Sequence, residues 1–220
     1  MTALVNISHD KCKVCYACVR VCPVNAIQVR TDQVVPVIMP NRCIGCGSCI
    51  AACKPCAIEY LDSTESTRQL LKDKKRKSAV IVDPTIAAEF PDITDYRKFV
   101  SMLRALGFSY VNEVSFGADL IAAAYSSLIK DFRGKYYIMA NDPVAIGYIE
   151  KFQPGLLPNL APLVTPAIAT AKVVREKYGK DLSIVYVGPL IATKKDEERG
   201  EGDGKLDAVL TFAELRDLFS

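Results

Sequence analysis

The chain has 220 residues, of which 50% are hydrophobic and 24% charged, and its formal net charge is +3. These values exclude a disordered or collagen-like chain and are typical of a globular protein with one fair-sized core or two smaller ones. No apolar run is long enough for a membrane helix, and the first residues, MTALVNISHDK, lack a signal-peptide pattern. We therefore expect a cytoplasmic protein without membrane insertion.

Cysteine is the unusual component of this sequence. All nine cysteines lie between Cys12 and Cys56, and the rest of the chain contains none. A disulfide framework would be spread more widely and would need an oxidising compartment. A local concentration of cysteines in a chain expected in the reducing cytoplasm instead indicates metal binding.

The cysteines form an internal repeat. The spacing C-x-x-C-x-x-C-x-x-x-C occurs at residues 12–22 and again 31 positions later, at 43–53. Each copy predicts a cysteine loop, a short helix after the third cysteine and a small strand, at 27–30 in the first copy and 58–61 in the second. A further β-rich run covers 34–39. We expect residues 1–62 to form a compact α+β domain.

This cysteine spacing resembles that of the bacterial two-cluster ferredoxins, in which three closely spaced thiolates bind three corners of one [4Fe-4S] cubane. In that family the fourth ligand of each cluster comes from the other repeat. The resemblance implies two [4Fe-4S] clusters with the ligand sets Cys12, Cys15, Cys18 and Cys53 for the first, and Cys43, Cys46, Cys49 and Cys22 for the second. Zinc also takes four thiolates, but its sites usually pair two C-x-x-C units that lie well apart, so we favour clusters.

Two further residues of metal-binding type lie beside the repeats. Cys56 aligns with Asn25 of the first repeat, which is not a ligand, so we expect a free or packed thiol. Alternatively, Cys56 replaces Cys53 as a ligand, because Lys54 stands where the first repeat has a proline. His9 is the only histidine and has no acid–base partners in the sequence, so we expect it neither to bind metal nor to catalyse.

Residues 63–77 are rich in Ser, Thr, Glu and Lys and predict a polar helical linker. Its basic run, 72–77, is interpreted as a solvated face rather than a docking patch for an acidic partner, because no aromatic residues interleave. Eight thiolate ligands and two cluster cores of roughly +2 each would bring the net charge to about −1. We therefore expect no nucleic-acid partner.

Residues 78–220 alternate between short β-branched runs and amphipathic stretches. Strands are predicted at 79–83, 110–114, 136–140, 183–188 and 207–211. Two helices are predicted from apolar residues at helical spacing: Phe116, Leu120, Ile121, Ala124, Tyr125 and Leu128 in one, and Ile168, Ala171, Val174 and Tyr178 in the other. Strands that alternate with helices indicate an α/β domain with a mostly parallel sheet.

Five segments of this second half resemble, in the same order, the catalytic domain of iron-only ([FeFe]) hydrogenases and their sensory or regulatory relatives. The segments are SAVIVDPTIAAEF, LRALGFSYVNEVSFGADL, YIEKFQPGLLPNLAPLVTP, VGPLIATKKDE and LDAVLTFAELRDLF. The resemblance implies a hydrogenase-like fold for residues 78–220. Whether the family's chemistry is retained depends on its ligands.

The family holds its active-site cluster, a [4Fe-4S] cubane joined to a two-iron subsite, with cysteines in T-S-C-[CS]-P, [MG]-P-C-x-A-K-K and C-terminal C-x-x-x-C segments. Asn141 and Leu190 occupy the first two cysteine positions here, and no C-x-x-x-C segment precedes Ser220. Neither Asn nor Leu replaces a thiolate on such a cluster. We expect a degenerate, C-terminally truncated domain with no catalytic residues and no hydrogenase activity.

Several polar motifs receive local structural interpretations. Residues 141–143, 83–84 and 165–166 each place a polar residue and a proline where a helix N-cap is expected. The glycine-rich stretch 200–205 matches no phosphate-binding spacing and predicts a polar, mobile surface loop.

Together these patterns predict an iron–sulfur electron-transfer or redox-sensing protein with a non-catalytic hydrogenase-like scaffold domain. Its expected partner is a redox protein, with a sensor or kinase module or a catalytic oxidoreductase subunit as candidates. The alternative is a subunit of an oxidoreductase complex whose catalytic centre lies in a partner chain or in a rebuilt cleft. A third hypothesis is a fragment with no role of its own.

Overall fold

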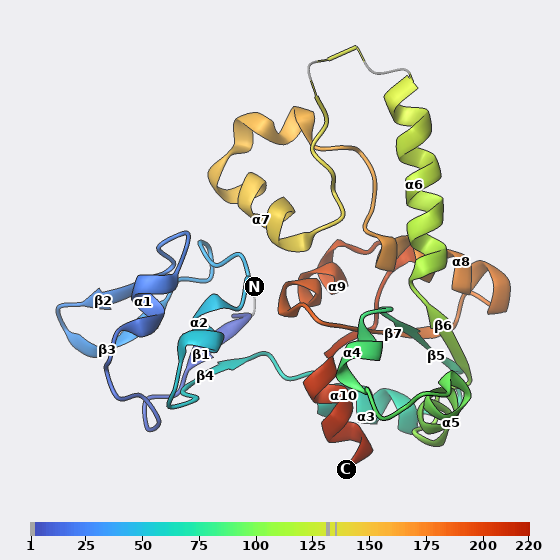
Figure 1. Cartoon of the computed structure of the whole chain (residues 1–220), viewed down its shortest axis with the longest axis horizontal. Helices are drawn as coiled ribbons and strands as arrows, with labels where there is room; N and C mark the ends of the chain where they lie inside the picture. The colour runs from blue at the N-terminus through green and yellow to red at the C-terminus, as the bar shows by residue number, and fades with distance from the viewer. Residues whose placement is uncertain (1–2, 131–132, 135) are drawn as a thin grey trace. The chain divides into compact units, whose positions relative to one another are not determined.

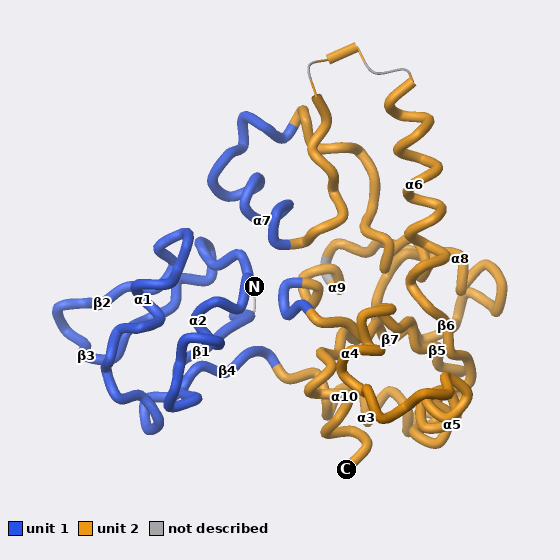
Figure 2. Tube along the Cα trace, viewed as in Figure 1, with its two compact units in different colours: residues 1–61, 144–157, 190–192 blue, residues 62–143, 158–189, 193–220 orange. Residues whose placement is uncertain are grey.

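The computed structural model describes residues 3–130, 133–134 and 136–220, which divide into two compact units (Figure 2). Unit 1 comprises Met1–Leu61, Val144–Leu157 and Leu190–Ala192, and unit 2 comprises Asp62–Pro143, Pro158–Pro189 and Thr193–Ser220. Unit 1 therefore contains the cysteine repeats together with two segments from the second half of the sequence. Among the described residues, no helix is long and apolar enough to cross a membrane.

Unit 1 is built from two antiparallel strand pairs and short helices (Figure 1). Strand β1 (Val5–Ile7) pairs with β4 (Ile58–Tyr60), and β2 (Ile27–Arg30) pairs with β3 (Gln33–Ile38). Helices α1 (Ala17–Val21) and α2 (Ser48–Ala52) begin beside the third cysteine of each repeat, and α7 (Pro143–Phe152) comes from later in the chain. Buried Val5, Ile7, Ile27 and Ile58 form a core against which six of the cysteines pack: Cys12, Cys18, Cys22, Cys43, Cys49 and Cys53.

The sequence repeat extends to the backbone conformation. Positive φ angles occur at Val14, Tyr16 and Asn25 in the first repeat, and at Gly45, Gly47 and Cys56 in the second. These positions are related by the same 31-residue offset as the cysteines. The two cysteine loops thus have the same local path, although the first repeat adopts the left-handed region without glycine.

Unit 2 contains a four-stranded parallel sheet in the order β6-β5-β7-β8. Its strands are β5 (Ser78–Val82), β6 (Tyr110–Glu113), β7 (Ser183–Gly188) and β8 (Ala208–Thr211). Alternating residues of β5 face opposite sides: Ala79 and Ile81 enter one core cluster, and Val80 and Val82 enter the other. The predicted parallel α/β sheet is confirmed.

Helices cover both faces of this sheet. Helix α8 (Pro166–Tyr178) packs on one face, where α6 (Ser115–Lys130) lies against it, while α3 (Thr64–Lys72), α5 (Tyr96–Ala105) and α10 (Phe212–Phe219) pack on the other. The remaining short helices are α4 (Ile86–Glu89), α9 (Asp196–Arg199), η1 (Pro154–Asn159), η2 (Ile191–Lys195) and η3 (Gly202–Gly204). Helix α3 occupies the segment predicted as a linker, and its Leu70 and Leu71 belong to the core of unit 2.

The predicted strand at 136–140 is wrong. In the described part of this segment, Ile138 makes one isolated parallel bridge to Leu160. Tyr136 and Met139 are exposed, so the apolar run that suggested a strand is not buried along its length. The N–H of Ile138 donates to the carbonyl of Asn159 at 2.7 Å, which ties the segment to a neighbouring loop instead of the sheet.

The two helices predicted from apolar spacing are found where they were expected, as α6 and α8. In α6, however, the buried residues are not all those that were predicted. Helix α6 buries Ile121 and Tyr125, whereas Phe116 and Leu120 are 56% and 42% exposed, contrary to the predicted stripe. The reason is Gly117, where an added Cβ would lie 2.1 Å from the Thr170 hydroxyl of α8. The close approach of the two helices at this glycine rotates the buried face away from the larger apolar residues.

Of the three predicted caps, the one at Thr165 is confirmed. The Thr165 hydroxyl accepts a hydrogen bond from the N–H of Ile168, at the start of α8. Asp83 does not cap a helix: α4 begins at Ile86, and the Asp83 carboxylate accepts the N–H of Thr85 in the preceding turn, at 2.9 Å.

The loop 200–205 has a defined anchor that the sequence did not suggest. The buried guanidinium of Arg175 donates to the carbonyl oxygens of Asp203 at 2.9 Å and of Lys205 at 2.5 Å. It also forms an ion pair with Asp207 at 2.7 Å. The loop is therefore fixed to helix α8 rather than being a simple polar connection.

Candidate functional site

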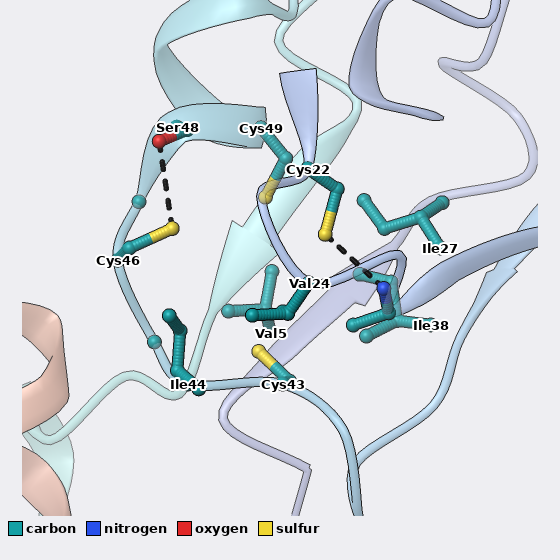
Figure 3. A pocket seen from close by; sticks show the side chains of 13 residues that line it. Val5, Cys22, Val24, Ile27, Ile38, Cys43, Ile44, Cys46, Ser48 and Cys49 are labelled. Atoms are coloured by element: carbon teal, nitrogen blue, oxygen red, sulfur yellow. Dashed lines mark hydrogen bonds between the residues drawn. The ribbon is translucent and has the colours of Figure 1, made fainter. Parts of the chain in front are cut away.

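Eight of the cysteines line two pockets of unit 1. The first pocket is lined by Cys12, Cys15, Cys18 and Cys53, and the second by Cys22, Cys43, Cys46 and Cys49. Figure 3 shows the four sulfur atoms of the second pocket pointing into a common space beside Val5, Val24 and Ile44. Each pocket combines three cysteines of one repeat with the last cysteine of the other, which is the partition implied by the resemblance to bacterial ferredoxins.

The last cysteine of each repeat lines the pocket formed mainly by the other repeat. In both repeats the sulfur of this cysteine accepts a hydrogen bond from an equivalent backbone N–H group. The N–H of Ala26 donates to the sulfur of Cys22 at 3.2 Å, and the N–H of Ala57 donates to the sulfur of Cys53 at 3.3 Å. A hydrogen bond of this kind stabilises negative charge on sulfur. Cys22 and Cys53 therefore accept equivalent backbone hydrogen bonds in the two repeats.

Cys56 lies outside this arrangement. It is exposed and is not among the residues that line either pocket. Its sulfur lies 3.8 Å from the carbonyl oxygen of Lys54, and its φ angle of 52° matches the 48° of Asn25 in the first repeat. Cys56 thus shares the backbone conformation of Asn25 and lies outside both pocket linings. His9 is exposed and lines neither pocket.

The pocket walls are mostly apolar, and this affects the thiols. Burial, assisted by the nearby sulfurs of Cys43 and Cys46, raises the pKa of Cys49 to about 11. Burial also raises the pKa of Cys18. Without a cation these sulfurs favour the protonated form, so metal binding must release protons and supply the positive charge that stabilises the thiolates.

The four cysteine sulfurs of each pocket suit a metal cluster of thiolate-binding ions. Each pocket presents four sulfur atoms, and soft thiolates favour iron–sulfur clusters, zinc or Cu(I) over hard cations. Within the described residues, no three His, Cys, Asp or Glu side chains converge closely enough to hold a single ion. The sulfurs instead surround a space, and the residues present fit a [4Fe-4S] cluster.

The two positions that correspond to hydrogenase cluster ligands carry no thiol. The side-chain oxygen of Asn141 is buried and accepts no hydrogen bond from the residues that the structure describes. Pro143 begins α7 as expected, and the cap predicted within residues 141–143 stays a prediction. Leu190 is 41% exposed, and its side chain has no donor atom.

Lys194, the first lysine after Leu190, is part of the core of unit 2. Its buried ammonium donates to Ser63 Oγ at 2.7 Å, to the Val209 carbonyl at 2.7 Å and to Glu214 Oε1 at 2.9 Å. Glu214 closes a capping box with Thr211 at the start of α10. These bonds give Lys194 a structural role that the sequence did not suggest, although the T-x-x-E spacing of residues 211–214 is a recognised capping signal.

Comparison with known protein families identifies the class of protein to which each part of the chain is similar. Residues 4–54 match the family described as 4Fe-4S dicluster domain, so the chain is an iron–sulfur protein with an electron-transfer role. Residues 76–220 match the family described as iron only hydrogenase large subunit, C-terminal domain. The chain belongs to this second family, which accounts for more than half of its length.

Three curated relatives illustrate the two parts of the chain. The NADP-reducing hydrogenase subunit HndD of Solidesulfovibrio fructosivorans is 25% identical, covering 95% of this chain and 43% of the relative. A polysulfide reductase subunit from Wolinella succinogenes is 32% identical over 47% of this chain and 59% of the relative. A ferredoxin of Rickettsia felis is 33% identical over 42% of this chain and 88% of the relative. The chain thus spans about half the length of the first two relatives.

Proposed function

We propose that this protein binds two [4Fe-4S] clusters and relays single electrons to a redox partner protein, with its hydrogenase-like domain acting as a non-catalytic scaffold. The first cluster would be held by Cys12, Cys15, Cys18 and Cys53, and the second by Cys22, Cys43, Cys46 and Cys49. The observation that carries this proposal is the lining of the two pockets, each of which contains three cysteines of one repeat and one of the other. The N-terminal part, residues 1–62, is the ferredoxin-like domain in this proposal.

The geometry supports clusters over zinc. A tetrahedral zinc site brings four sulfurs to about 2.3 Å from one ion. The four cysteines of each pocket instead line a shared space, and among the described residues no three His, Cys, Asp or Glu side chains lie close enough together to hold a single ion. Backbone N–H groups directed at Cys22 and Cys53 also suit cluster ligands, because such bonds tune the reduction potential.

The chain's own residues have three tasks in this function. The thiolates bind the iron, the N–H groups of Ala26 and Ala57 hold negative charge on the ligand sulfurs, and apolar side chains such as Val24 and Ile44 exclude water. The clusters supply one-electron oxidation and reduction when bound, and the protein sets their potential and the route of the electron.

Residues of the hydrogenase-like part of the sequence support the absence of hydrogen chemistry. Asn141 and Leu190 stand where the family's cluster cysteines are expected, and neither side chain provides a thiolate. Lys194, from the adjacent family segment, is already bonded to three acceptors within the core of unit 2. We therefore assign this domain a docking or coupling role.

The names of the relatives favour an oxidoreductase subunit as the partner. HndD is named as a subunit of an NADP-reducing hydrogenase, and the Wolinella relative as a component of polysulfide reductase. In the second candidate function, which these names favour, the chain works inside a larger oxidoreductase whose catalytic centre lies in a partner chain. A sensor or kinase module is the other candidate partner, and a cytoplasmic location accords with either.

Counting electrons tests the proposal. Anaerobically reconstituted protein should accept two electrons per chain from a graded titration with dithionite and return them to an oxidised acceptor. It should produce no hydrogen with reduced methyl viologen. Uptake of one electron or none would contradict the two-cluster proposal, and sustained hydrogen production would contradict the non-catalytic role of the second domain.

A further inference from the structure

Helix α7 connects the second half of the sequence to the second cysteine pocket. Val144 and Phe152, near its two ends, pack against buried Val24 and Ile44, which also line that pocket. Ala26, whose N–H donates to the sulfur of Cys22, belongs to the same apolar cluster. Helix α7 therefore packs against residues that line the pocket shown in Figure 3.

A lysine of this helix reaches the backbone at a predicted ligand. The half-buried Lys151 donates from Nζ to the carbonyl oxygen of Cys43 at 2.7 Å and to that of Pro40 at 3.0 Å. The intervening turn is closed by the N–H of Cys43, which donates to the carbonyl of Met39 at 3.0 Å. One ammonium thus bridges two carbonyl oxygens of the turn that leads into Cys43.

A second cation reinforces the same place. The guanidinium of Arg42 donates to the carbonyl of Val24 at 3.0 Å and lies 5.0 Å from the centre of the Phe152 ring. Arg42 precedes Cys43, and Phe152 follows Lys151. Two positive charges are therefore held against the backbone of the second pocket by specific contacts.

We infer that Lys151 is a positioning residue that raises the reduction potential of the second cluster, an inference that rests on the two-cluster function proposed above. Reduction adds one negative charge to a cluster, and a nearby fixed cation stabilises that added charge. The bond to the Cys43 carbonyl holds the cation beside a ligand and limits its freedom to move away. Lys151 thereby makes the two repeats unequal, although their cysteine loops follow the same path.

The test uses full-length, reconstituted protein and an EPR-monitored redox titration. Lys151→Met removes the charge and the hydrogen bonds, Lys151→Gln removes the charge but keeps a donor, and Lys151→Arg keeps both. Lys98→Met, at an exposed position of α5, makes the same change in net charge elsewhere and serves as the control. A Cys15→Ser variant, altered in the first pocket, assigns the two reduction waves to their clusters.

We expect Lys151→Met and Lys151→Gln to lower the midpoint of the second cluster, with at least a tenfold change in its reduced-to-oxidised ratio, about 59 mV for a one-electron couple. The other wave should not move, Lys151→Arg should remain close to wild type, and Lys98→Met should move neither wave. Two unshifted waves in variants that retain about eight irons would overturn the inference and leave the two-cluster function standing. About four irons per chain in the wild-type protein would overturn both the inference about Lys151 and the two-cluster function.

Discussion

Replacing Lys194 by Met tests the structural role of a lysine that family resemblance would place near a catalytic cluster. The Lys194–Glu214 pair has side-chain exposures of 0% and 4%, so solvent screens it very little. Removing one partner of such a pair typically costs about 3–5 kcal/mol, because the remaining charge stays buried without compensation. The Glu214 carboxylate keeps the N–H groups of Ser63 and Thr211 as donors, which favours the lower end of this range.

The free energy of unfolding should be measured by guanidinium denaturation, followed by far-UV circular dichroism. We expect Lys194→Met to lose about 3 kcal/mol, while Lys98→Met, with the same change of charge on the surface, should lose less than about 0.5 kcal/mol. Adding Glu214→Gln to Lys194→Met removes the uncompensated charge and should recover part of the loss. A loss below about 1 kcal/mol for Lys194→Met, with no recovery in the double variant, would refute the assigned role.

Two further predictions concern the cysteine pockets. Cys53→Ser should remove about half of the iron bound per chain, whereas Cys56→Ser should retain all of it; loss of iron only from the Cys56 variant would show that the ligand is misassigned. Gly45→Ala should destabilise the fold by about 1–2 kcal/mol and impair the second cluster first, because its φ is +76° and an added Cβ would lie 2.6 Å from a methyl carbon of Leu4. Gly155→Ala, where nothing lies within 4 Å of the added Cβ, is the matched control, and equal melting temperatures for the two variants would contradict the packing argument.

Local patterns explain why much of the first unit was predictable. The two cysteine motifs, the short helices that contain their third cysteines and the strands at 27–30 and 58–60 are close in sequence and repeat at a fixed offset. The left-handed conformation of Gly45 and Gly47 also accords with loops that need glycine. Val14 and Tyr16 show the limit of that signal, since they adopt the same conformation without being glycine.

The parallel sheet was also predictable, because its central strands are continuous β-branched runs buried on both faces. The segment 136–140 is also apolar but leaves two of its large side chains exposed, a difference that composition does not reveal. The buried face of α6 depends on where α8 approaches it, and that contact is set by Gly117 and Thr170 rather than by apolar spacing.

Long-range polar contacts could not be predicted from the sequence. Lys194 bonds to Ser63, 131 positions earlier in the chain, and Lys151 bonds to the carbonyl of Cys43 from 108 positions away. Nothing in the sequence around either lysine indicates these acceptors. Only the fold brings them to their acceptors, and this is why the inferred control of the second cluster emerges from the structure alone.

The most direct test of the account is a count of iron and acid-labile sulfide per chain after anaerobic reconstitution, combined with EPR of the reduced protein. Two [4Fe-4S] clusters predict about eight irons, about eight sulfides and the signals of two interacting clusters. About twelve or more irons would contradict a hydrogenase-like domain without a cluster of its own. Zinc in place of iron would contradict the electron-transfer function itself.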